Sequence, residues 1–228
     1  GIEEIQAVDF RYAERIGAST IKQLAVARRR GSAVQVFVAP ALVARESFLA
    51  GVDGATNAVC FAGKSSGGGR GARDCDYVLV GPGAGGGPTA VAVLGDVCEL
   101  ARGTRQFSGA PSLIPPGTLK LQREEEIDVP FYVRFVVKDR AGIVGDIGKT
   151  FGRMGVNISE IWQLRHVEEE LRSLMQSYRL KQKPGEILPF VMTLERAKLR
   201  QMRRALDSIR NRDYILVDPL WFPIWSSS

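Results

Sequence analysis

The C-terminal part of the sequence, residues 130–222, switches repeatedly between the apolar spacing of a strand and that of a helix. FYVRFVVKD alternates at every second residue, whereas AGIVGDIGKTFGRMG places its apolar residues on one helical face and closes on Gly155. The strand patterns VNISEIWQL, LPFVMTLE and DYILVDPLWF and the helix pattern RAKLRQMRRALDSIRN follow, with an extra helix in HVEEELRSLMQSY. Without that extra helix the order is βαββαβ, which is the ferredoxin-like arrangement.

Residues 1–103 mix short strands and helices. DFRYAERIG predicts a helix that stops at Gly17, and TIKQLAVARRRGSAVQVFVAP predicts a hairpin with RRRGS as its tight link. NAVCFAG and DYVLVG predict a second strand pair, and Pro88 opens a helix that runs to Gly103. The segment 104–129 holds three prolines and an acidic run without a sustained period, which is typical of a linker.

The net charge of +6 at pH 7 favours anionic partners in general. The densest basic clusters are ARRRG, at the expected end of the hairpin, and KLRQMRR, beside the apolar stripe of the last helix. No aromatic residue is interleaved with either cluster, as a platform for stacked bases would require. Solvent-exposed charge explains both clusters better than nucleic-acid binding, and we expect no nucleic-acid partner.

The cysteine and histidine content argues against a metal site. Cys60, Cys75 and Cys98 lack C-x-x-C spacing, and His166 is the single histidine of the sequence. We expect no bound metal, and the odd cysteine count predicts free thiols in a reducing compartment.

The sequence also carries no targeting or membrane signal. No apolar run approaches the ~20 residues that span a bilayer, and the N-terminus has no signal pattern. These features predict a cytoplasmic protein without membrane contact. The absence of an initiator Met indicates a processed chain or a piece of a longer protein.

The stretch DYVLVGPGAGGGPTAVAVLGDV resembles a phosphate-binding turn between a strand and a helix. Gly81, Gly83 and Gly86 fit the spacing G-x-G-x-x-G of dinucleotide-binding folds. No second buried strand follows the helix, however, and Ala101 and Arg102 stand where an acid would hold the ribose. Two interpretations stay open: a turn whose backbone approaches an anionic ligand at the helix N-terminus, and a plain strand-to-helix turn.

Several segments together resemble the later part of the homoserine dehydrogenase catalytic region: GIEEIQAVDFRYAERIG, IKQLAVARR, VFVAPALV, FLAGVDGATNAV and GPGAGGGPTAVAVLGDV. The trailing zone resembles an ACT domain, with FYVRFVVKDRAGIVGDIGKTFGRMGVNISEI as its leading half. The resemblance implies an α+β fold in which a mixed-sheet catalytic and dimerisation region precedes a ferredoxin-like ACT domain. The implied boundaries are 1–103 for the first region, 104–129 for the linker, 130–222 for the ACT domain and 223–228 for a tail.

The resemblance implies an oxidoreductase of threonine, methionine and isoleucine biosynthesis. The family reaction is the NAD(P)-dependent interconversion of L-aspartate 4-semialdehyde and L-homoserine. The chain begins after the nucleotide-binding domain and after the stretch that holds the family's catalytic lysines and acids, so we assign no catalytic residue and expect the chain to be inactive alone. The alternative is a non-catalytic dimerisation module that senses an amino acid through an ACT domain.

In the family the glycine turn lies against the nicotinamide cofactor, NADP or NAD, which the missing N-terminal domain mainly holds. By this resemblance Gly85 touches the cofactor. The helix from Pro88 to Arg102 would pack on the missing domain, which predicts an exposed apolar stripe in this chain. The residues assigned to the cofactor are Gly83, Ala84, Gly85, Gly86 and Thr89.

The predicted strands of the first region resemble the sheet through which the family dimerises. The apolar face of that sheet would combine Leu24 and Val26 with Val34, Val36 and Val38. This interpretation predicts a homo-oligomer, either a dimer or a tetramer. A sheet covered by its own helices is the alternative.

ACT domains commonly bind a small amino acid between paired domains, as an allosteric effector, and threonine is the candidate here. Asp139 would pair with the ammonium group, and the N–H groups beyond Gly142 would bind the carboxylate. Many ACT domains have Pro-Gly where this chain has Ala141-Gly142. In the alternative, Asp139 only caps the helix and Gly142 only turns the chain. The assigned effector residues are Asp139, Arg140, Ala141, Gly142, Ile143, Asn157 and Ile158.

An insert from His166 to about Ile187 separates the second and third strands of the ACT pattern. It is larger than a plain hairpin, so we expect it to form subunit contacts or to block the effector pocket.

Overall fold

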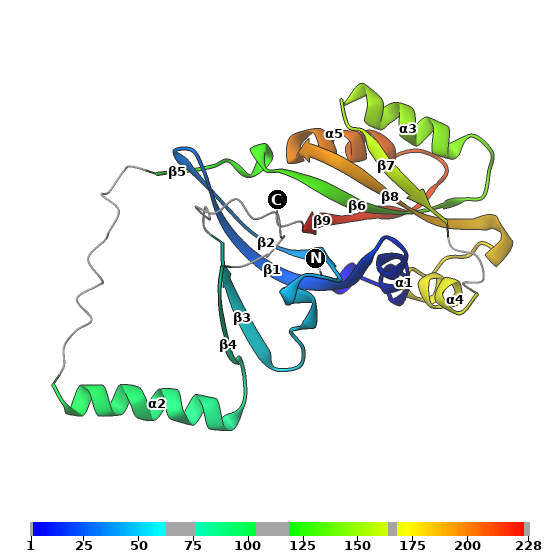
Figure 1. The fold of residues 1–228 in the computed structure, drawn as a ribbon. Helices are drawn as coiled ribbons and strands as arrows, with labels where there is room; N and C mark the ends of the chain where they lie inside the picture. The colour runs from blue at the N-terminus through cyan, green and yellow to red at the C-terminus, as the bar shows by residue number, and fades with distance from the viewer. Residues whose placement is uncertain (1, 63–75, 104–118, 164–167, 226–228) are drawn as a thin grey trace. The chain divides into compact units, whose positions relative to one another are not determined.

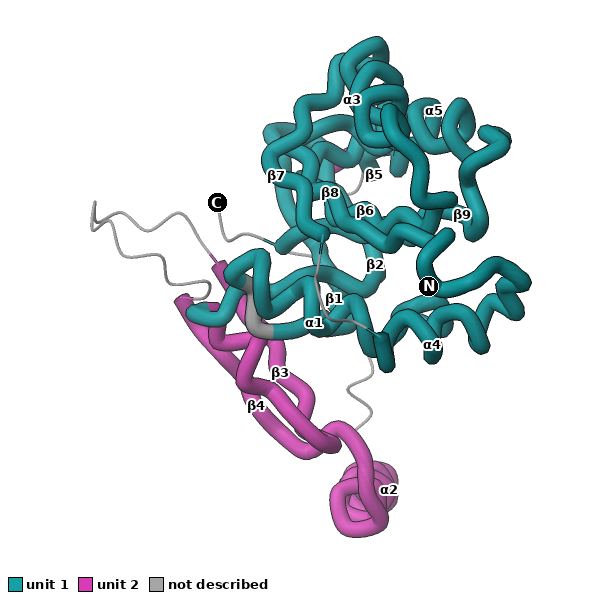
Figure 2. The backbone as a smooth tube through the Cα atoms, turned by 90° about the vertical axis from the view of Figure 1, so that its right-hand side faces the viewer, with its two compact units in different colours: residues 1–46, 121–226 teal, residues 47–120, 227–228 magenta. Residues whose placement is uncertain are grey.

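The structure is a computed structural model that describes residues 2–62, 76–103, 119–163 and 168–225. The chain divides into two compact units (Figure 2). Unit 1 comprises residues 1–46 and 121–226, and unit 2 comprises residues 47–120 and 227–228. Unit 1 therefore takes residues from both the first and the third regions of the sequence. The boundaries 1–103 and 130–222 stay a prediction.

Unit 1 is built on one mixed sheet with the strand order β1-β2-β9-β6-β8-β7 (Figure 1). All neighbouring strands along this order are antiparallel except β2 and β9, which are parallel at Leu42–Ile224 and Val43–Trp225. The prediction of an α+β fold with a mixed sheet is confirmed. The strands are β1 (Ala18–Arg30), β2 (Ala33–Ala44), β5 (Lys120–Leu121), which pairs with β2, β6 (Asp128–Lys138), β7 (Ile158–Trp162), β8 (Ile187–Lys198) and β9 (Ile215–Trp225).

Helices cover both faces of this sheet (Figure 1). The first face packs against α3 (Ile143–Arg153) and α5 (Leu199–Arg210), and the opposite face packs against α1 (Ala7–Arg15) and α4 (Glu168–Ser177). Alternate residues of β6 enter the two cores, because neighbouring side chains of a strand point to opposite faces. Phe131, Val133, Phe135 and Val137 face α3 and α5, whereas Tyr132 and Val136 face α1 and α4.

The predicted insert supplies α4, whose Leu174 is buried in the same core as Tyr12 of α1. Arg11 of α1 and Glu170 of α4 form an ion pair at 2.9 Å. Within the chain the insert therefore packs on helix α1. His166 lies outside the described residues.

A buried polar network joins α1 to β6. Arg134 Nη1 donates to Asp9 Oδ2 at 2.6 Å, and the Tyr132 hydroxyl donates to Asp9 Oδ1 at 2.7 Å. Arg134 Nη2 also donates to the Tyr178 hydroxyl, which follows α4, at 2.9 Å. The backbone N–H of Gln6 gives Asp9 a third donor at 2.7 Å.

Element boundaries differ from the sequence patterns by a few residues. α5 begins at Leu199 because Arg196 and Lys198 still belong to β8, and β9 extends beyond residue 222 to Trp225. The first part of the predicted linker lies outside the described residues. Its remainder forms β5, the short 3-10 helix η3 (Glu124–Glu126) and the start of β6. Further 3-10 turns are η1 (Ile2–Glu4), η2 (Phe48–Gly51) and η4 (Pro184–Glu186).

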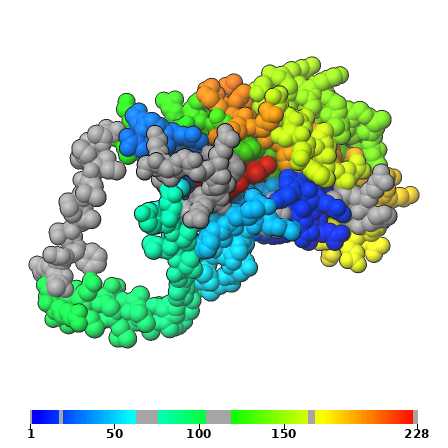
Figure 3. All heavy atoms as spheres, viewed as in Figure 1, coloured from blue at the N-terminus to red at the C-terminus, as the bar shows by residue number. Residues whose placement is uncertain are grey.

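Unit 2 contains an antiparallel strand pair and one long helix. β3 (Thr56–Phe61) and β4 (Tyr77–Pro82) pair with Phe61 opposite Tyr77 and Thr56 opposite Pro82. α2 (Gly86–Ala101) follows β4 through the glycine turn and begins two residues before Pro88. None of the residues of α2 is buried, and Figure 3 shows the surface of this helix in green.

Candidate functional site

The glycine turn between β4 and α2 contains one backbone conformation restricted to glycine, at Gly85, and one close side-chain neighbour, at Gly83. The Gly83 N–H donates to Ala55 O at 2.6 Å, and a Cβ placed on Gly83 would lie 2.3 Å from the side chain of Asn57. Gly85 has φ 128° and ψ 153°, a region essentially restricted to glycine. At this turn the chain therefore changes direction, and its backbone also comes close to the backbone of Ala55.

The first turn of α2 is held by Thr89. Its backbone N–H and its hydroxyl both donate to Gly85 O, at 3.1 and 2.9 Å. The N–H groups of Gly86 and Gly87 precede that first intrahelical bond, and Pro88 has no N–H to offer. Two backbone donors at the positive end of the helix dipole suit a polar or anionic ligand edge. The structure thus brings together all the residues assigned to the cofactor: Gly83, Ala84, Gly85, Gly86 and Thr89.

Asn57 is the residue of this site that the sequence pattern missed. It stands opposite Gly81 in the β3–β4 register, and its side chain fills the space beside Gly83. Only the pairing of β3 with β4 places Asn57 against the turn. The sequence predicted the pair but not its register, so it gave no signal for this contact.

The apolar side chains of unit 2 are largely exposed. On α2, Leu94 is 62% exposed and Leu100 is 77% exposed, which confirms the predicted apolar stripe. One face of the β3–β4 pair adds further exposed side chains, because residues opposite each other in the register share a face. These are Val59, Phe61, Tyr77 and Leu79.

The turn after β6, assigned to the effector, begins with a backbone contact to the 3-10 helix η4. The Asp139 N–H donates to Glu186 O at 2.9 Å, and Gly142 lies in the left-handed region with φ 89° as the residue before α3. Ala141 is exposed between them, whereas Ile143 is buried in the core under α3.

Arg140 does not point to an open pocket. Its two terminal nitrogens donate to the two carboxylate oxygens of Asp213, at 3.2 and 3.3 Å, and its guanidinium lies 5.9 Å from the ring centre of Tyr214. These bonds lower the pKa of Asp213. Burial, and then a 2.7 Å hydrogen bond to Asp146, raise the pKa of Tyr214. Asp213, Tyr214 and Asp146 therefore brace this turn, a role that the sequence did not reveal.

Asn157 and Ile158, the remaining effector assignments, lie at the other end of the sheet. Asn157 Nδ2 donates to Glu195 Oε2 at 3.1 Å, and Ile158 stands opposite Leu194 of β8. The turn after Lys138, by contrast, adjoins Ile187 of β8. Ile187 and Leu194 are seven residues apart, about 23 Å along an extended strand. One chain therefore does not bring the two groups together.

The predicted composition of the β1–β2 apolar face needs a correction. The register sets Ala27 opposite Val36 and Ala25 opposite Val38, so these side chains share one face. Val36 and Val38 are 51% and 65% exposed, whereas Leu24 and Val26 are each 8% exposed. Leu24 and Val26 point to the opposite face, with Phe37 across from Val26.

Among the described cysteines the prediction of free thiols holds for Cys98 and fails for Cys60. Cys98 is free and exposed, whereas Cys60 is disulfide-bonded, which corrects the expectation for that residue. Cys75 lies outside the described residues. Among the described residues no cluster of three metal-ligating side chains is present, and none of their helices is long and apolar enough to cross a bilayer.

Comparisons with known proteins agree with the sequence resemblance. Residues 1–98 match the family model described as homoserine dehydrogenase. The homoserine dehydrogenase of Helicobacter pylori is 31% identical over 163 residues, which is 72% of this chain and 36% of that protein. That of Synechocystis sp. is 33% identical over 174 residues, which is 72% of this chain and 38% of that protein.

A solved structure shows the same fold. The homoserine dehydrogenase of Thiobacillus denitrificans superposes with a TM-score of 0.72 at 24% identity, covering 100% of this chain and 47% of that one. The chain spans 36–38% of the length of these two curated relatives. The resemblance to homoserine dehydrogenase is confirmed, and a C-terminal fragment of such an enzyme fits these matches.

Proposed function

We propose, from the homoserine dehydrogenase match over residues 1–98, that this chain is the C-terminal part of an NAD(P)-dependent homoserine dehydrogenase. The reaction is the reversible interconversion of L-aspartate 4-semialdehyde and L-homoserine, on the route to threonine, methionine and isoleucine. The glycine turn is the observation that carries this proposal. The Asn57 side chain fills the space beside Gly83, and Gly85 has a glycine-only backbone at the start of a helix.

The residues of the turn fit a nicotinamide cofactor, NADP or NAD, that another domain mainly holds. A flat ring can approach the backbone of Gly85 closely because no side chain intervenes, and the N–H groups of Gly86 and Gly87 can donate to its polar edge. When bound, the nicotinamide carries the hydride that passes to or from the substrate carbon. Thr89 would keep the turn in shape through its two bonds to Gly85 O.

The exposed apolar side chains of α2 support the proposal that another domain of the parent enzyme holds the cofactor. Leu94, Val97 and Leu100 are each more than half exposed, and exposed apolar side chains grouped in this way mark interaction sites. We propose that these side chains pack on the nucleotide-binding domain of the parent enzyme. This contact would hold the glycine turn beside the cofactor.

The proposal is tested by comparing the turnover of residues 1–228 alone with that of the enzyme that also contains the upstream part. Residues 1–228 alone, with L-homoserine and NADP or NAD, should show no turnover, because the upstream catalytic residues are absent. The upstream part of the parent enzyme, in one chain or added separately, should restore turnover. In the restored enzyme Gly85→Val should lower kcat/KM by about 100-fold, the cost of misplacing a reacting group by ~1 Å.

The matched control is Gly152→Ala on α3, where an added Cβ meets nothing within 4 Å. This variant should retain the activity of the restored enzyme. Robust turnover by residues 1–228 alone would overturn the proposal that catalysis needs the upstream part. Unchanged activity in Gly85→Val would overturn the role of the turn.

We propose further that the strands β6, β7, β8 and β9 with α3 and α5 form a ferredoxin-like ACT domain, close to the boundaries 130–222. The support is their spatial order β9-β6-β8-β7, with every neighbouring pair antiparallel and both helices on one face. A sequence order of βαββαβ with this strand order is the ferredoxin-like topology.

An amino-acid effector, for which the family resemblance suggests threonine, would then bind between two paired domains. The turn at Asp139–Ile143 of one copy would face Asn157 and Ile158 of another, since one chain keeps the two groups about 23 Å apart along β8. The exposed β1–β2 face at Val36 and Val38 supports a homo-oligomer, a dimer or tetramer in the parent enzyme. We place that enzyme in the cytoplasm, without a membrane or nucleic-acid partner.

A further inference from the structure

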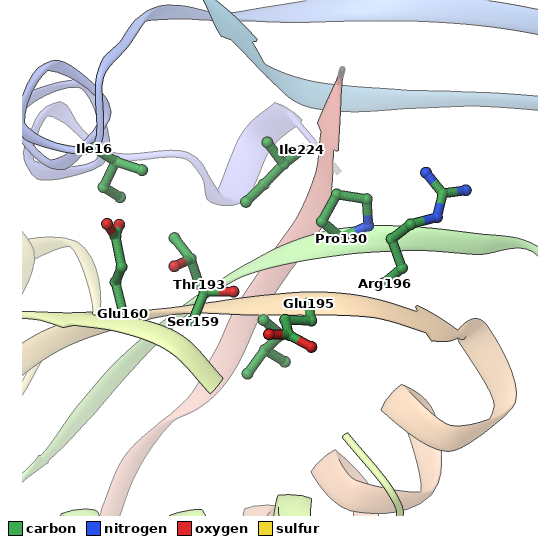
Figure 4. Close-up of a pocket in the computed structure, with 9 residues that line it drawn as sticks. Ile16, Pro130, Ser159, Glu160, Thr193, Glu195, Arg196 and Ile224 are labelled. Carbon is green, nitrogen blue, oxygen red and sulfur yellow. The ribbon is translucent and has the colours of Figure 1, made fainter. Parts of the chain in front are cut away.

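Three polar side chains of the pocket on unit 1 are buried or already bonded within the chain. Figure 4 shows this pocket of about 520 Å³, with Glu160 and Arg196 on opposite sides of Thr193. The Thr193 hydroxyl oxygen is buried beyond the reach of a ligand. Glu160 accepts from Trp162 Nε1 at 2.9 Å, and Arg196 Nη2 donates to Asp128 O at 2.8 Å. An exposed side-chain amide that makes no hydrogen bond to the described residues lies instead in unit 2.

The side chain of Asn57 lies against the glycine turn. Its Cγ and Nδ2 atoms lie 2.3 Å, and its Oδ1 atom 2.5 Å, from the position that a Cβ on Gly83 would take. All three atoms are about equally far from that position, so the flat carboxamide turns one face toward Gly83. The edges of the carboxamide, which carry its hydrogen-bonding atoms, stay open.

Asn57 has hydrogen-bonding capacity that the described part of the chain does not use. Its side chain makes no hydrogen bond to any described residue, and the residue is exposed. An amide carries two N–H donors and an oxygen acceptor, so a ligand can reach a donor and an acceptor side by side. The contact with Gly83 also limits the rotation of the side chain, which lowers the entropy that ligand binding would cost.

The Asn57 amide lies close to the N-terminus of α2. Gly83 and Gly85 are two residues apart in the chain, so their Cα atoms are at most about 7 Å apart. The N–H groups of Gly86 and Gly87 follow at the start of the helix. A flat ligand that lies on Gly85 can therefore extend a carboxamide substituent toward Asn57. The nicotinamide ring of NADP or NAD has this shape, with its carboxamide on the ring edge.

We propose that Asn57 binds the carboxamide group of the nicotinamide ring. Asn57 Oδ1 would accept a hydrogen bond from the NH2 group of the ring carboxamide, and Asn57 Nδ2 would donate to its carbonyl oxygen. Two primary carboxamides can pair in this way because each has a donor edge and an acceptor edge. The ring carbonyl oxygen keeps a second lone pair for the N–H group of Gly86 or Gly87. This role of Asn57 rests on the function proposed above, since that function requires the cofactor.

Cofactor binding to the restored enzyme, residues 1–228 together with the upstream part, tests this pair. Titration calorimetry compares NADP, or NAD if the restored enzyme prefers it, with its 3-acetylpyridine analogue, in which a methyl group replaces the NH2 group. The wild-type enzyme should bind the cofactor about fivefold more tightly than the analogue, the value of one hydrogen bond. Equal binding of the two compounds by the wild-type enzyme would overturn the proposal.

Two variants of Asn57 separate hydrogen bonding from shape. Asn57→Leu has a similar volume but no polar side-chain atom, so it should weaken cofactor binding by about 30-fold, the value of two hydrogen bonds. It should also no longer distinguish the cofactor from the analogue. Asn57→Asp keeps the Oδ1 acceptor and should retain the preference of about fivefold. A preference that persists in Asn57→Leu would overturn the proposal, and so would a preference that both variants lose equally.

Thr56→Val is the matched control, because this neighbouring residue of β3 points to the opposite face of the strand. It should leave the binding of both compounds unchanged. If the restored enzyme turns over L-homoserine and Gly85→Val lowers its activity, while Asn57→Leu keeps the wild-type preference, the role of Asn57 is excluded and the proposed function stands. A restored enzyme that neither binds the cofactor nor turns over L-homoserine would overturn the proposed function itself.

Discussion

At the scale of single residues, Asp9 and Arg134 show how a charged pair can sit wholly inside this protein. Their side chains are 0% and 1% exposed and meet at 2.6 Å. Three donors, from Arg134, Tyr132 and the Gln6 backbone, satisfy the Asp9 carboxylate. Burial of two charges is tolerable when the pair is kept together and most of its remaining bonds are made, and here Arg134 Nε has no hydrogen-bond partner among the described residues. This pair therefore fixes how α1 lies on β6.

Asp9→Leu should lower the free energy of unfolding by about 3–5 kcal/mol, because it leaves the Arg134 guanidinium buried without its anion. Chemical denaturation followed by circular dichroism measures this loss. The double variant Asp9→Leu with Arg134→Met should recover a large part of it, since no uncompensated charge remains. A double variant as unstable as Asp9→Leu would show that the ion pair is not the source of the loss.

The sequence indicates that Arg134 needs a buried partner, but it does not indicate that the partner is Asp9. Arg134 interrupts the apolar run FYVRFVVK, in a strand that is buried on both faces, and such a charge needs a partner. The partner is 125 residues away along the chain, however, and no spacing rule reaches that far. The contact of Asn57 with Gly83 was missed for a related reason, because the spacing of apolar residues does not determine the register between two strands.

At the scale of elements, η3 docks on the basic face of α5. Glu126 accepts from Lys198 Nζ at 2.6 Å and from Arg200 Nη1 at 2.5 Å, and Glu124 pairs with Arg203. The sequence assigned these basic residues to a solvent-exposed helix face and the acidic run to a linker. Both interpretations missed that the two charged segments neutralise each other.

Glu126→Gln should lower the unfolding temperature at pH 7 but not at strongly acidic pH. The hydrogen bond from Lys198 holds the pKa of Glu126 below its ordinary value of 4.5. The stabilisation is therefore present above that ordinary value and is lost as the pH falls through the lowered one. Thermal unfolding at several pH values measures the effect. Glu125→Gln, which alters none of these contacts, is the control, and an equal effect of both variants would contradict the prediction.

At the scale of the whole molecule, the order of strands and helices could be predicted from the sequence, and their assembly could not. The patterns predicted each main element within a few residues because each has a clear apolar period. The parallel pairing of β2 with β9 was not predictable, since Leu42 and Ile224 come from opposite ends of the chain. The exposed stripe of α2 was predicted only through the family resemblance.

The exposed stripe of α2 should make the isolated chain bind apolar dyes and self-associate. Leu94→Lys with Leu100→Lys should lower both the fluorescence of 8-anilinonaphthalene-1-sulfonate and the sedimentation coefficient, because the apolar surface shrinks. Leu121→Lys changes another exposed leucine outside α2 and serves as the control. Dye binding that persists in the α2 variant would show that the apolar surface responsible lies outside α2.

The pairing of β2 with β9 also sets when this protein can finish folding. Among the described strands of this sheet β9 comes last in the sequence, so the β1–β2 hairpin leaves the ribosome well before its neighbour in the sheet. Domains tend to fold as they emerge during synthesis, and contacts between distant segments form late. The edge of β2 near Leu42 and Val43 therefore stays unpaired until β9 has been synthesised, and an unpaired strand edge can pair with other chains.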